Sequence, residues 1–309
     1  MGLKDYFSLQ KDSGRDFVED DCSTQAAALS YYTVFSLPPL LLLLLMLVGA
    51  IVDPREVEGA IRTQINSLMG SGAADQIRTI LQVAHRPGSG GIIATVAGLV
   101  TLLLGAAGAF GQLQAALNRA WEVAPDPQQG GLKAFLVKRV FSFGMVLSVA
   151  FLLLVSLVLS AALSGFGDRL GGMLPAGLSS TLLQVFNQVL SFVVITALFA
   201  AIFKVLPDAT AAWRDVWVGA AVTALLFVVG KFLIGLYLGR SNPGEAFGAA
   251  GSLALILVWI YYSSMILLFG AEFTQAWAER VGRGVTPEKG AVQVNELKKE
   301  AQAGQRTPA

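Results

Sequence analysis

The sequence predicts an all-helical, polytopic membrane protein with six transmembrane helices and both termini in the cytoplasm. Hydrophobic residues make up 54% of the 309 residues and charged residues only 14%, which is more apolar surface than a soluble core of this size buries. Six apolar stretches are each long enough to cross a bilayer core of about 30 Å as a helix. Lysine and arginine gather in alternate connecting segments, as expected for cytoplasmic loops.

The predicted spans are continuously apolar instead of alternating, which favours helices because backbone polar groups in lipid must be satisfied within one segment. They cover residues 27–52, 91–118, 140–163, 182–206, 216–238 and 251–273. With residues 1–26 inside, the inner segments hold 15 lysine and arginine residues, the outer segments hold 6, and one lysine lies within a span. Tryptophans mark the same inner ends, where their amphipathic rings prefer the headgroup zone. They are Trp121, Trp213, Trp217 and Trp277.

The chain divides into three predicted parts. Residues 1–26 form a cytoplasmic or interfacial N-terminal segment, and residues 27–278 form the six-helix membrane domain. Residues 279–309 are rich in Gly, Pro, Lys, Glu and Gln, which predicts a disordered cytoplasmic tail. In the outer loop 53–90, apolar residues recur at helical spacing, which predicts short helices. These helices either cap the bundle or form an outer vestibule or membrane-surface platform, and both interpretations stand.

The first span carries Pro38 and Pro39 near its middle. Two adjacent prolines remove two backbone donors and crowd the preceding turn, so we expect a kinked or broken helix there. The freed carbonyl groups either line a wet cavity, as in transporters, or pack against protein. The sequence favours neither interpretation.

Lys231 lies inside the fifth span, about 22 Å along the helix from its inner end. A charged residue in that position costs about 2.5–3.5 kcal/mol unless it is paired or reaches the headgroups. At matching depth in the fourth span lie Gln184, Asn187 and Gln188, and Glu245 follows in the outer loop. We expect these groups to meet in an outward-facing cavity that binds an anionic substrate. The alternative is a lysine that snorkels to the outer headgroups.

Other polar residues of the spans are predicted to line a path or to connect helices. The tyrosine hydroxyls within the membrane are those of Tyr31, Tyr32, Tyr261 and Tyr262. The candidates for ion pairs at the cytoplasmic ends are Lys204, Asp208, Arg214, Asp215 and Glu272. Among these, Glu272 is expected to pair with Lys204 or Arg214. A run of small residues in the second span predicts close helix packing, and a dimer interface is the alternative use.

Several functions are not supported by the sequence. Cys22 is the single cysteine and His85 the single histidine, so a metal centre built from these residue types is not expected, nor is any cofactor. A net charge of +1 without a basic face gives no support for a nucleic-acid partner. A phosphate-binding loop of the Walker type is absent from the sequence, which argues against direct use of ATP. We therefore do not expect an enzyme.

Long segments of the chain resemble the YihY/BrkB family of bacterial inner-membrane proteins. They are AAALSYYTVFSLPPLLLL from Ala26, LNRAWEV from Leu117, KRVFSFGMVLSVAFLLLVSLVLSAAL from Lys138, FKVLPDATAAWRDVWVGAAVTALLFVVGKFLIGLYLG from Phe203 and GAAGSLALILVWIYYSSMILLFGAEFTQAWA from Gly248. They agree in order and spacing across most of residues 26–278. The resemblance implies six spans in the bacterial cytoplasmic membrane. Members carry the label virulence factor and, in older usage, ribonuclease BN.

Some members of that family are linked to lipid or lipopolysaccharide traffic, which suggests a translocator of amphiphiles. The proline pair, Lys231 and all the ion-pair candidates except Lys204 stand at family motif positions. Met265 stands where a glutamine is expected and Phe247 where a tyrosine is usual. If those polar groups touch substrate in relatives, this protein handles a less polar one.

Three functions compete on this basis. The first is a transporter or lipid translocator with membrane lipids as partners, which predicts a wet, laterally open groove. The second is a non-transporting scaffold for envelope integrity, which predicts a dry bundle and either a homo-oligomer or an envelope protein partner. The third is the nuclease of the older label, which fares worst because the cytoplasmic acidic groups lie in no basic groove.

Overall fold

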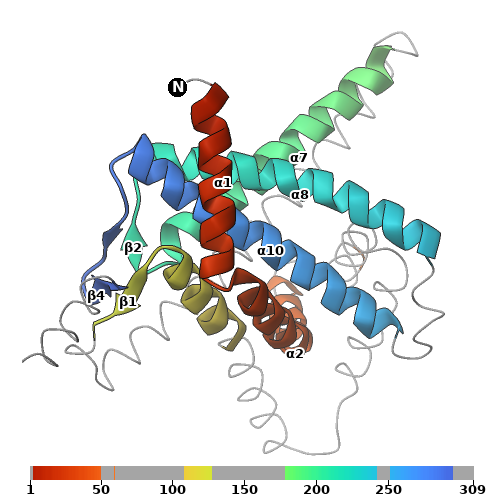
Figure 1. Cartoon of the computed structure of the whole chain (residues 1–309). Helices are drawn as coiled ribbons and strands as arrows, with labels where there is room; N and C mark the ends of the chain where they lie inside the picture. Colours follow the sequence, from red (N-terminus) through yellow and green to blue (C-terminus); the bar gives the residue numbers. More distant parts are fainter. Residues whose placement is uncertain (1–2, 50–58, 60–107, 127–177, 242–250, 295–309) are drawn as a thin grey trace, which may run out of the picture.

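The computed structural model describes residues 3–49, 59, 108–126, 178–241 and 251–294, and the structural statements below concern these residues. They form α1 (Leu3–Glu19), α2 (Cys22–Gly49), a helical segment over 108–120, α7 (Leu178–Val205), α8 (Trp213–Ser241) and α10 (Gly251–Arg280) (Figure 1). The helical fold class is therefore confirmed in this part of the chain. The predicted third span, Glu245 and all of the outer loop 53–90 except residue 59 lie outside the described residues.

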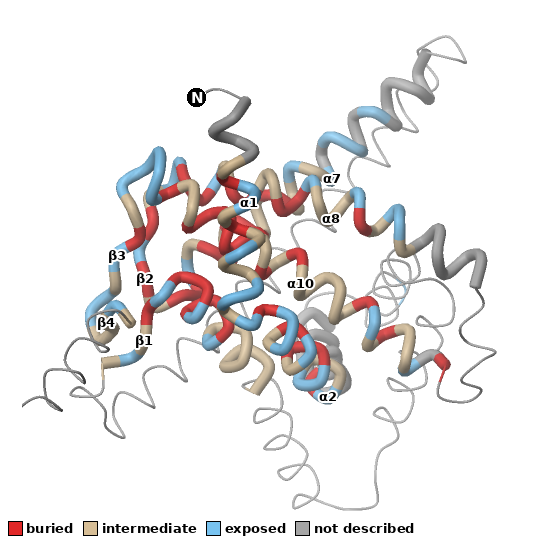
Figure 2. The backbone as a smooth tube through the Cα atoms, in the orientation of Figure 1, coloured by how far each residue is buried: buried red, intermediate tan, exposed pale blue. Residues whose placement is uncertain are grey.

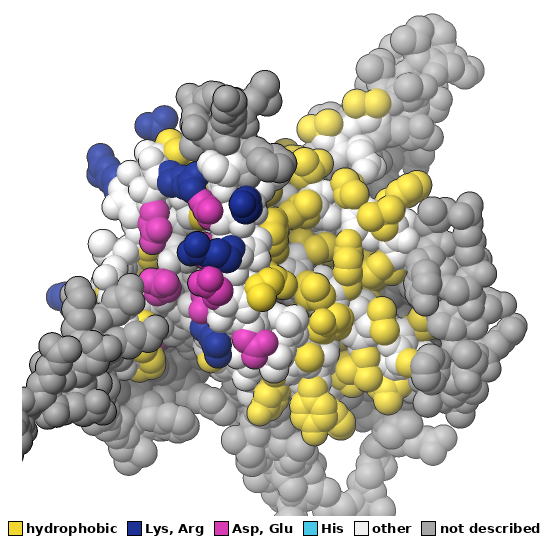
Figure 3. All heavy atoms as spheres, viewed as in Figure 1, with side chains coloured by type: hydrophobic (Ala, Val, Ile, Leu, Met, Phe, Trp, Pro, Cys, Tyr) yellow, Lys and Arg dark blue, Asp and Glu magenta, His cyan; other side chains and the backbone are white. Residues whose placement is uncertain are grey.

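Two of these helices are long and apolar enough to cross a bilayer, over Trp213–Ile234 and Leu253–Arg280. A shorter apolar helix covers Ser191–Val205. Their exposed side chains are largely apolar, and Figure 3 shows apolar groups gathered across one flank of the molecule beside a charged area. The number of spans and the side on which the termini lie stay predictions.

α2 is continuous from Cys22 to Gly49, so a break at Pro38 and Pro39 is wrong, and the alternative of a kink there stays a prediction. Proline holds its φ angle near the helical value, so the pair removes two hydrogen bonds without forcing either residue out of the helix. Lipid also penalises unpaired backbone groups, which favours keeping the rest of the helix hydrogen-bonded across the pair.

α8 and α10 pack through two reciprocal glycine–threonine contacts. Thr274 of α10 lies against Gly219 of α8, and Thr223 of α8 lies against Gly270 of α10. Each threonine hydroxyl donates to the carbonyl oxygen four residues earlier in its own helix, at 2.7 Å for Thr223 and 2.6 Å for Thr274. The polar hydroxyls are therefore satisfied within each helix, and the glycines let the two backbones approach closely.

Two short antiparallel sheets hold the segment after α10. β4 (Ala291–Gln293) pairs with β1 (Val123–Pro125), and β3 (Thr286–Pro287) pairs with β2 (Ala209–Thr210). Residues 281–294 are thus structured, which corrects the prediction of a tail disordered from residue 279. Composition failed here because the partner strands lie more than 70 residues away in the sequence.

The buried core is concentrated at one end of the molecule, where buried residues from several segments converge (Figure 2). We call this region the polar end and define it as α1 with residues 20–26, 108–126, 206–217 and 271–294. Charged side chains gather over α1 and the end of α10 in the space-filling view (Figure 3). The polar end therefore unites a buried core with a charged surface, and it adjoins the apolar flank.

Candidate functional site

A side-chain network joins three distant segments at the polar end. Asn118 Nδ2 donates to Asp208 Oδ2 at 2.9 Å, and the backbone N–H of Asp208 donates to Asn118 Oδ1 at 2.8 Å. Gln114 Nε2 donates to the other carboxylate oxygen of Asp208 at 3.1 Å. The carbonyl oxygen of Asp208 accepts from the backbone N–H of Glu288 at 3.0 Å. Asp208 is therefore the junction between the helical segment 108–120, the turn before α8 and the C-terminal strands.

The spacing of this network follows from helix geometry. Gln114 and Asn118 are four residues apart, so they lie on one face of the helical segment 108–120 and reach the same carboxylate. Asn118 is only 6% exposed, and a buried amide without partners would be costly. The reciprocal bonds satisfy it and fix the turn between α7 and α8.

A second set of buried contacts connects α10 to two other places. They are Trp121, directly after the helical segment 108–120, and Cys22, at the start of α2. Trp121 Nε1 donates to the carbonyl oxygen of Ala271 at 3.1 Å. The adjacent Glu272 accepts a hydrogen bond from Cys22 Sγ at 3.3 Å through Oε1. Burial raises the pKa of the Cys22 thiol, so the thiol is neutral and able to donate. The ring of Trp121 is buried within the protein and so does not face lipid headgroups, while its depth at the inner end of a span stays a prediction.

Replacing Trp121 by phenylalanine is expected to destabilise the protein by about 1–3 kcal/mol. The change removes the N–H donor to Ala271 and leaves unfilled volume in a packed core. Thermal unfolding of purified protein in detergent measures the effect. Trp217→Phe is the matched control, because Trp217 is exposed, and its unfolding temperature should stay close to wild type. Equal effects of the two substitutions would contradict the structural role of the indole N–H.

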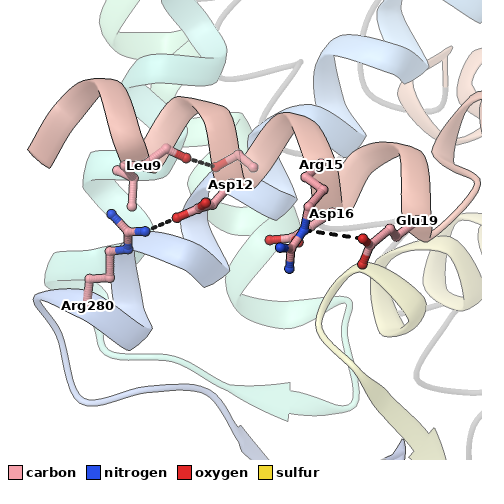
Figure 4. A network of polar contacts seen from close by, with 7 residues as sticks. Leu9, Asp12, Arg15, Asp16, Glu19 and Arg280 are labelled. Atoms are coloured by element: carbon pink, nitrogen blue, oxygen red, sulfur yellow. Dashed lines mark hydrogen bonds and ion pairs between the residues drawn. The ribbon is translucent and has the colours of Figure 1, made fainter. Parts of the chain in front are cut away.

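Ion pairs fasten α1 to the end of α10 (Figure 4). Arg280 pairs with Asp12 and donates to Ser8 Oγ at 2.7 Å. Arg15 lies 3.2 Å from Glu19 and 3.7 Å from Asp16 within α1. These pairs are solvent-accessible, so each contributes roughly 0–1 kcal/mol. Of these contacts, those of Arg280 join α1 to α10 and orient α1, whereas the Arg15 pairs lie within α1.

Asp20 lies between α1 and α2. Burial raises the pKa of its carboxyl group above the usual value, and the Arg119 guanidinium at 3.9 Å only partly opposes this rise. The next residue, Asp21, has a positive φ of 55° and caps α2. Its carboxylate accepts from Thr24 Oγ1 at 2.9 Å, and its carbonyl oxygen accepts from the Thr24 N–H at 3.1 Å. This turn sets α2 at its angle to α1 and presents Cys22 toward α10.

The ion-pair partners predicted for Glu272 are wrong. Lys204 Nζ donates to the carbonyl oxygen of Ala211 at 2.7 Å and lies 5.7 Å from the centre of the Trp213 ring. Arg214 is exposed, and within the described residues neither it nor Lys204 pairs with Glu272. The sequence suggested these pairs because all three residues lie near the same ends of their spans, which does not specify which helix faces point toward each other.

Asp215 is buried at the start of α8, where its carboxylate packs against Gly282. A carboxylate in the first turn of a helix is favoured by the helix dipole. The close approach requires a residue without a side chain at 282. Asp215 thus holds the segment after α10 against the start of α8, a structural role that does not depend on an ion pair with Arg214.

Lys231 is half-buried on α8, beside the exposed Phe232 and next to Gly230, against which Tyr262 packs. Gln188 is exposed on α7, and α7 and α8 diverge toward the ends that carry these two residues (Figure 1). Among the described residues Lys231 has no hydrogen bond or ion pair. The side chains of Gln184 and Asn187 lie outside the described residues. The predicted cavity around Lys231 therefore stays a prediction.

The predicted tyrosines divide between two helices. Tyr31 and Tyr32 are exposed on α2, with their ring centres 5.8 Å apart, and the ring of Phe35 lies 4.8 Å from that of Tyr31. Tyr261 and Tyr262 are half-buried on α10. The structure shows edge-to-face and tilted aromatic rings on α2 and a packing role for Tyr262, but it brings no two of these hydroxyl groups together within the described residues.

Sequence reasoning missed Asn118, Gln114 and Cys22. The i, i+4 spacing of Gln114 and Asn118 at the polar end of an apolar helix was the available signal for the first two. For Cys22 no sequence signal existed, because its partner is 250 residues away. The described part of the chain has no cluster of three or more His, Cys, Asp or Glu side chains arranged for a metal ion.

Comparison with known proteins places these observations in a family. The model of the family described as Virulence factor BrkB matches residues 14–293. A UPF0761 membrane protein of Alcanivorax borkumensis is 26% identical over 266 residues, covering 85% of this chain and 58% of the relative. A UPF0761 membrane protein of Pseudomonas aeruginosa is 29% identical over 262 residues, covering 82% of this chain and 59% of the relative. A UPF0761 membrane protein of Alkalilimnicola ehrlichii is 30% identical over 266 residues, covering 85% of this chain and 56% of the relative.

The chain thus spans less than three fifths of the length of these relatives. No solved structure matches it. The match over residues 14–293 includes all the side chains of the Asp208 and Glu272 contacts, so both contacts lie within the family's common region. The resemblance found in the sequence is confirmed, and the names of the relatives support a membrane protein.

Proposed function

The chain belongs to the Virulence factor BrkB family, whose relatives are named membrane proteins, and from this premise we propose that it transports or translocates a lipid or another amphiphilic anion. We place it as a multi-pass protein of the bacterial inner membrane. The proposal concerns the whole protein, whose substrate is not given by the names of its relatives.

The observation that supports transport is a cationic side chain on an apolar helix. Lys231 lies within the apolar stretch Trp213–Ile234 of α8. The surrounding exposed side chains on that helix are Leu225, Val229, Phe232 and Leu233. A lysine in this setting is expensive to insert unless it has a partner or reaches the headgroups. An anionic headgroup supplies the partner, and the apolar surface suits the attached acyl chains.

This arrangement suggests how an amphiphile would be held. The headgroup would accept hydrogen bonds from the Lys231 ammonium group, and the acyl chains would stay against the exposed flank of α8. The divergence of α7 from α8 leaves Lys231 without a described neighbour on α7 to neutralise it (Figure 1). The substrate class that fits is therefore anionic at one end and apolar along its length.

Replacing Lys231 by methionine is expected to reduce transport of a fluorescent anionic phospholipid in proteoliposomes at least about tenfold. Methionine preserves the length of the side chain but removes the charge that would bind the headgroup. Lys289→Met is the matched control, because Lys289 is exposed in the turn between β3 and β4. Unchanged transport in the Lys231 variant would exclude this residue from the mechanism.

A wild-type protein that moves no lipid would instead favour the alternative of a non-transporting scaffold in envelope integrity. Pull-down in mild detergent would then return a stoichiometric envelope partner or a homo-oligomer. A lone monomer without transport activity would contradict both proposals.

A further inference from the structure

The carboxyl group of Glu272 has surroundings that the proposed transport site does not explain. Its side chain is 1% exposed, and so is Cys22, which donates to Oε1. The second carboxyl oxygen, Oε2, is buried without a hydrogen-bond partner in the described part of the chain. An ionised carboxylate placed this way would be far more costly than a neutral carboxyl group, because burial penalises charge most strongly.

The charged groups around Glu272 do not compensate a negative charge. The charged groups on neighbouring elements that act on it are Asp20 before α2, Asp16 of α1 and Glu122 after the helical segment 108–120, and all three are acidic. Arg119, a basic group at this end of the molecule, is paired with Asp20 at 3.9 Å. The neutral Cys22 faces Glu272 from α2.

The described contacts of α8 with this stretch of α10 are uncharged. From α8, Gly219 and Thr223 pack against Thr274 and Gly270, on either side of Glu272 in the sequence. Arg280, at the end of α10 itself, is paired with Asp12. Within the described part of the chain, the groups around Glu272 are therefore apolar, neutral or acidic, or are basic groups already paired with Asp12 or Asp20.

We propose that Glu272 is a proton-binding site, which holds a proton in the resting protein and packs most stably between α2 and α10 while that proton is bound. Loss of the proton would place an uncompensated negative charge beside three other acidic groups at the contact between Cys22 and Glu272. The Cys22 thiol could still donate to the carboxylate, but the packing of α2 against α10 would be less stable, because this one hydrogen bond does not offset a buried charge. This proposal goes beyond the transport function and does not depend on it.

Infrared difference spectroscopy of wild type against Glu272→Gln in detergent tests the protonation state directly, because the subtraction removes the bands of other buried carboxyl groups such as that of Asp215. We expect the carbonyl stretch of a protonated carboxylic acid at pH 7, lost as the pH is raised. Exposed carboxyl groups are ionised at pH 7 and do not contribute to this band. A spectrum without the band at pH 7 would overturn the proposal.

Glu272→Gln gives the second measurement, because glutamine imitates the protonated acid and cannot ionise. Above the ordinary pKa of glutamate, wild type must take up a proton to fold, so we expect the unfolding temperature of the variant to equal that of wild type at about pH 4 and to exceed it by roughly 2–4 °C or more at pH 9. Glu288→Gln, in the exposed turn between β3 and β4, is the control and should follow wild type at both values. A variant that is less stable than wild type by the same amount at both values would show that the ionised carboxylate stabilises the fold, which contradicts the proposal.

Discussion

Replacement of Gly270 by alanine is expected to destabilise the protein by about 3 kcal/mol and to remove most of the monodisperse protein from detergent extracts. The added methyl group would lie 2.8 Å from both Cβ and Cγ2 of Thr223, which is closer than real side-chain carbons approach. The threonine cannot turn away easily, because its Cβ is fixed to the α8 backbone and its hydroxyl is bonded to the Gly219 carbonyl oxygen. The helices must therefore separate. Fluorescence-detected size-exclusion chromatography and thermal unfolding measure the loss.

Two further variants distinguish this clash from a general effect of alanine. A methyl group added at Gly14 of α1 would have no described atom within 4 Å. Gly14→Ala should therefore be neutral or stabilising by up to about 1 kcal/mol. Combining Thr223→Gly with Gly270→Thr recreates on this pair the arrangement of Gly219 and Thr274, with glycine on α8 and threonine on α10. The exchange should recover much of the lost stability. A double variant no better than Gly270→Ala would contradict the reciprocal packing described here.

The sequence was informative where a property belongs to one segment. Apolar length predicted α8 and α10 as membrane-spanning candidates, and both are long apolar helices in the structure. Lys204 was placed correctly near a helix end, although its bond to the Ala211 carbonyl oxygen was not foreseen. Residue type and spacing define such features locally, because helix length and hydropathy need no knowledge of a partner.

Prediction failed where partners come from different helices. Glu272 was assigned a basic partner because Lys204 and Arg214 lie near the same ends of their spans, yet its partner is the thiol of Cys22. Charge complementarity says nothing about which face of α10 turns toward α2. The tail after Arg280 failed for a similar reason, since β3 and β4 are stabilised by backbone pairing with distant loops that composition does not show.

The second large effect is expected from Asn118→Asp. Asn118 Nδ2 now donates to Asp208 Oδ2 at 2.9 Å, and a carboxylate in its place would face another carboxylate at that distance without a proton between them. Asn118 is buried, so water screens the repulsion poorly. We expect a loss of about 2–4 kcal/mol in unfolding free energy and detachment of the C-terminal strands, which are bonded to Asp208 through Glu288. Limited proteolysis after Arg280 would detect the detachment.

Exchanging Asn118 and Asp208 tests the cause of this loss of stability. The loss comes either from two carboxylates facing each other or from a need for asparagine at position 118. In the double variant Asn118→Asp with Asp208→Asn, the new amide would donate to the new carboxylate and its oxygen would still accept from Gln114 Nε2. The carboxylate at 118 would keep the backbone N–H of residue 208, which donates to Oδ1 of Asn118 at 2.8 Å. Every bond of the junction is then restored with the charge moved from one side to the other. We expect protease resistance and unfolding temperature to return close to wild type, because the same donors face the same acceptors. Persistent cleavage after Arg280 in the double variant would mean that the charge must stay on the turn before α8, and the junction would then depend on more than this hydrogen-bonded pair.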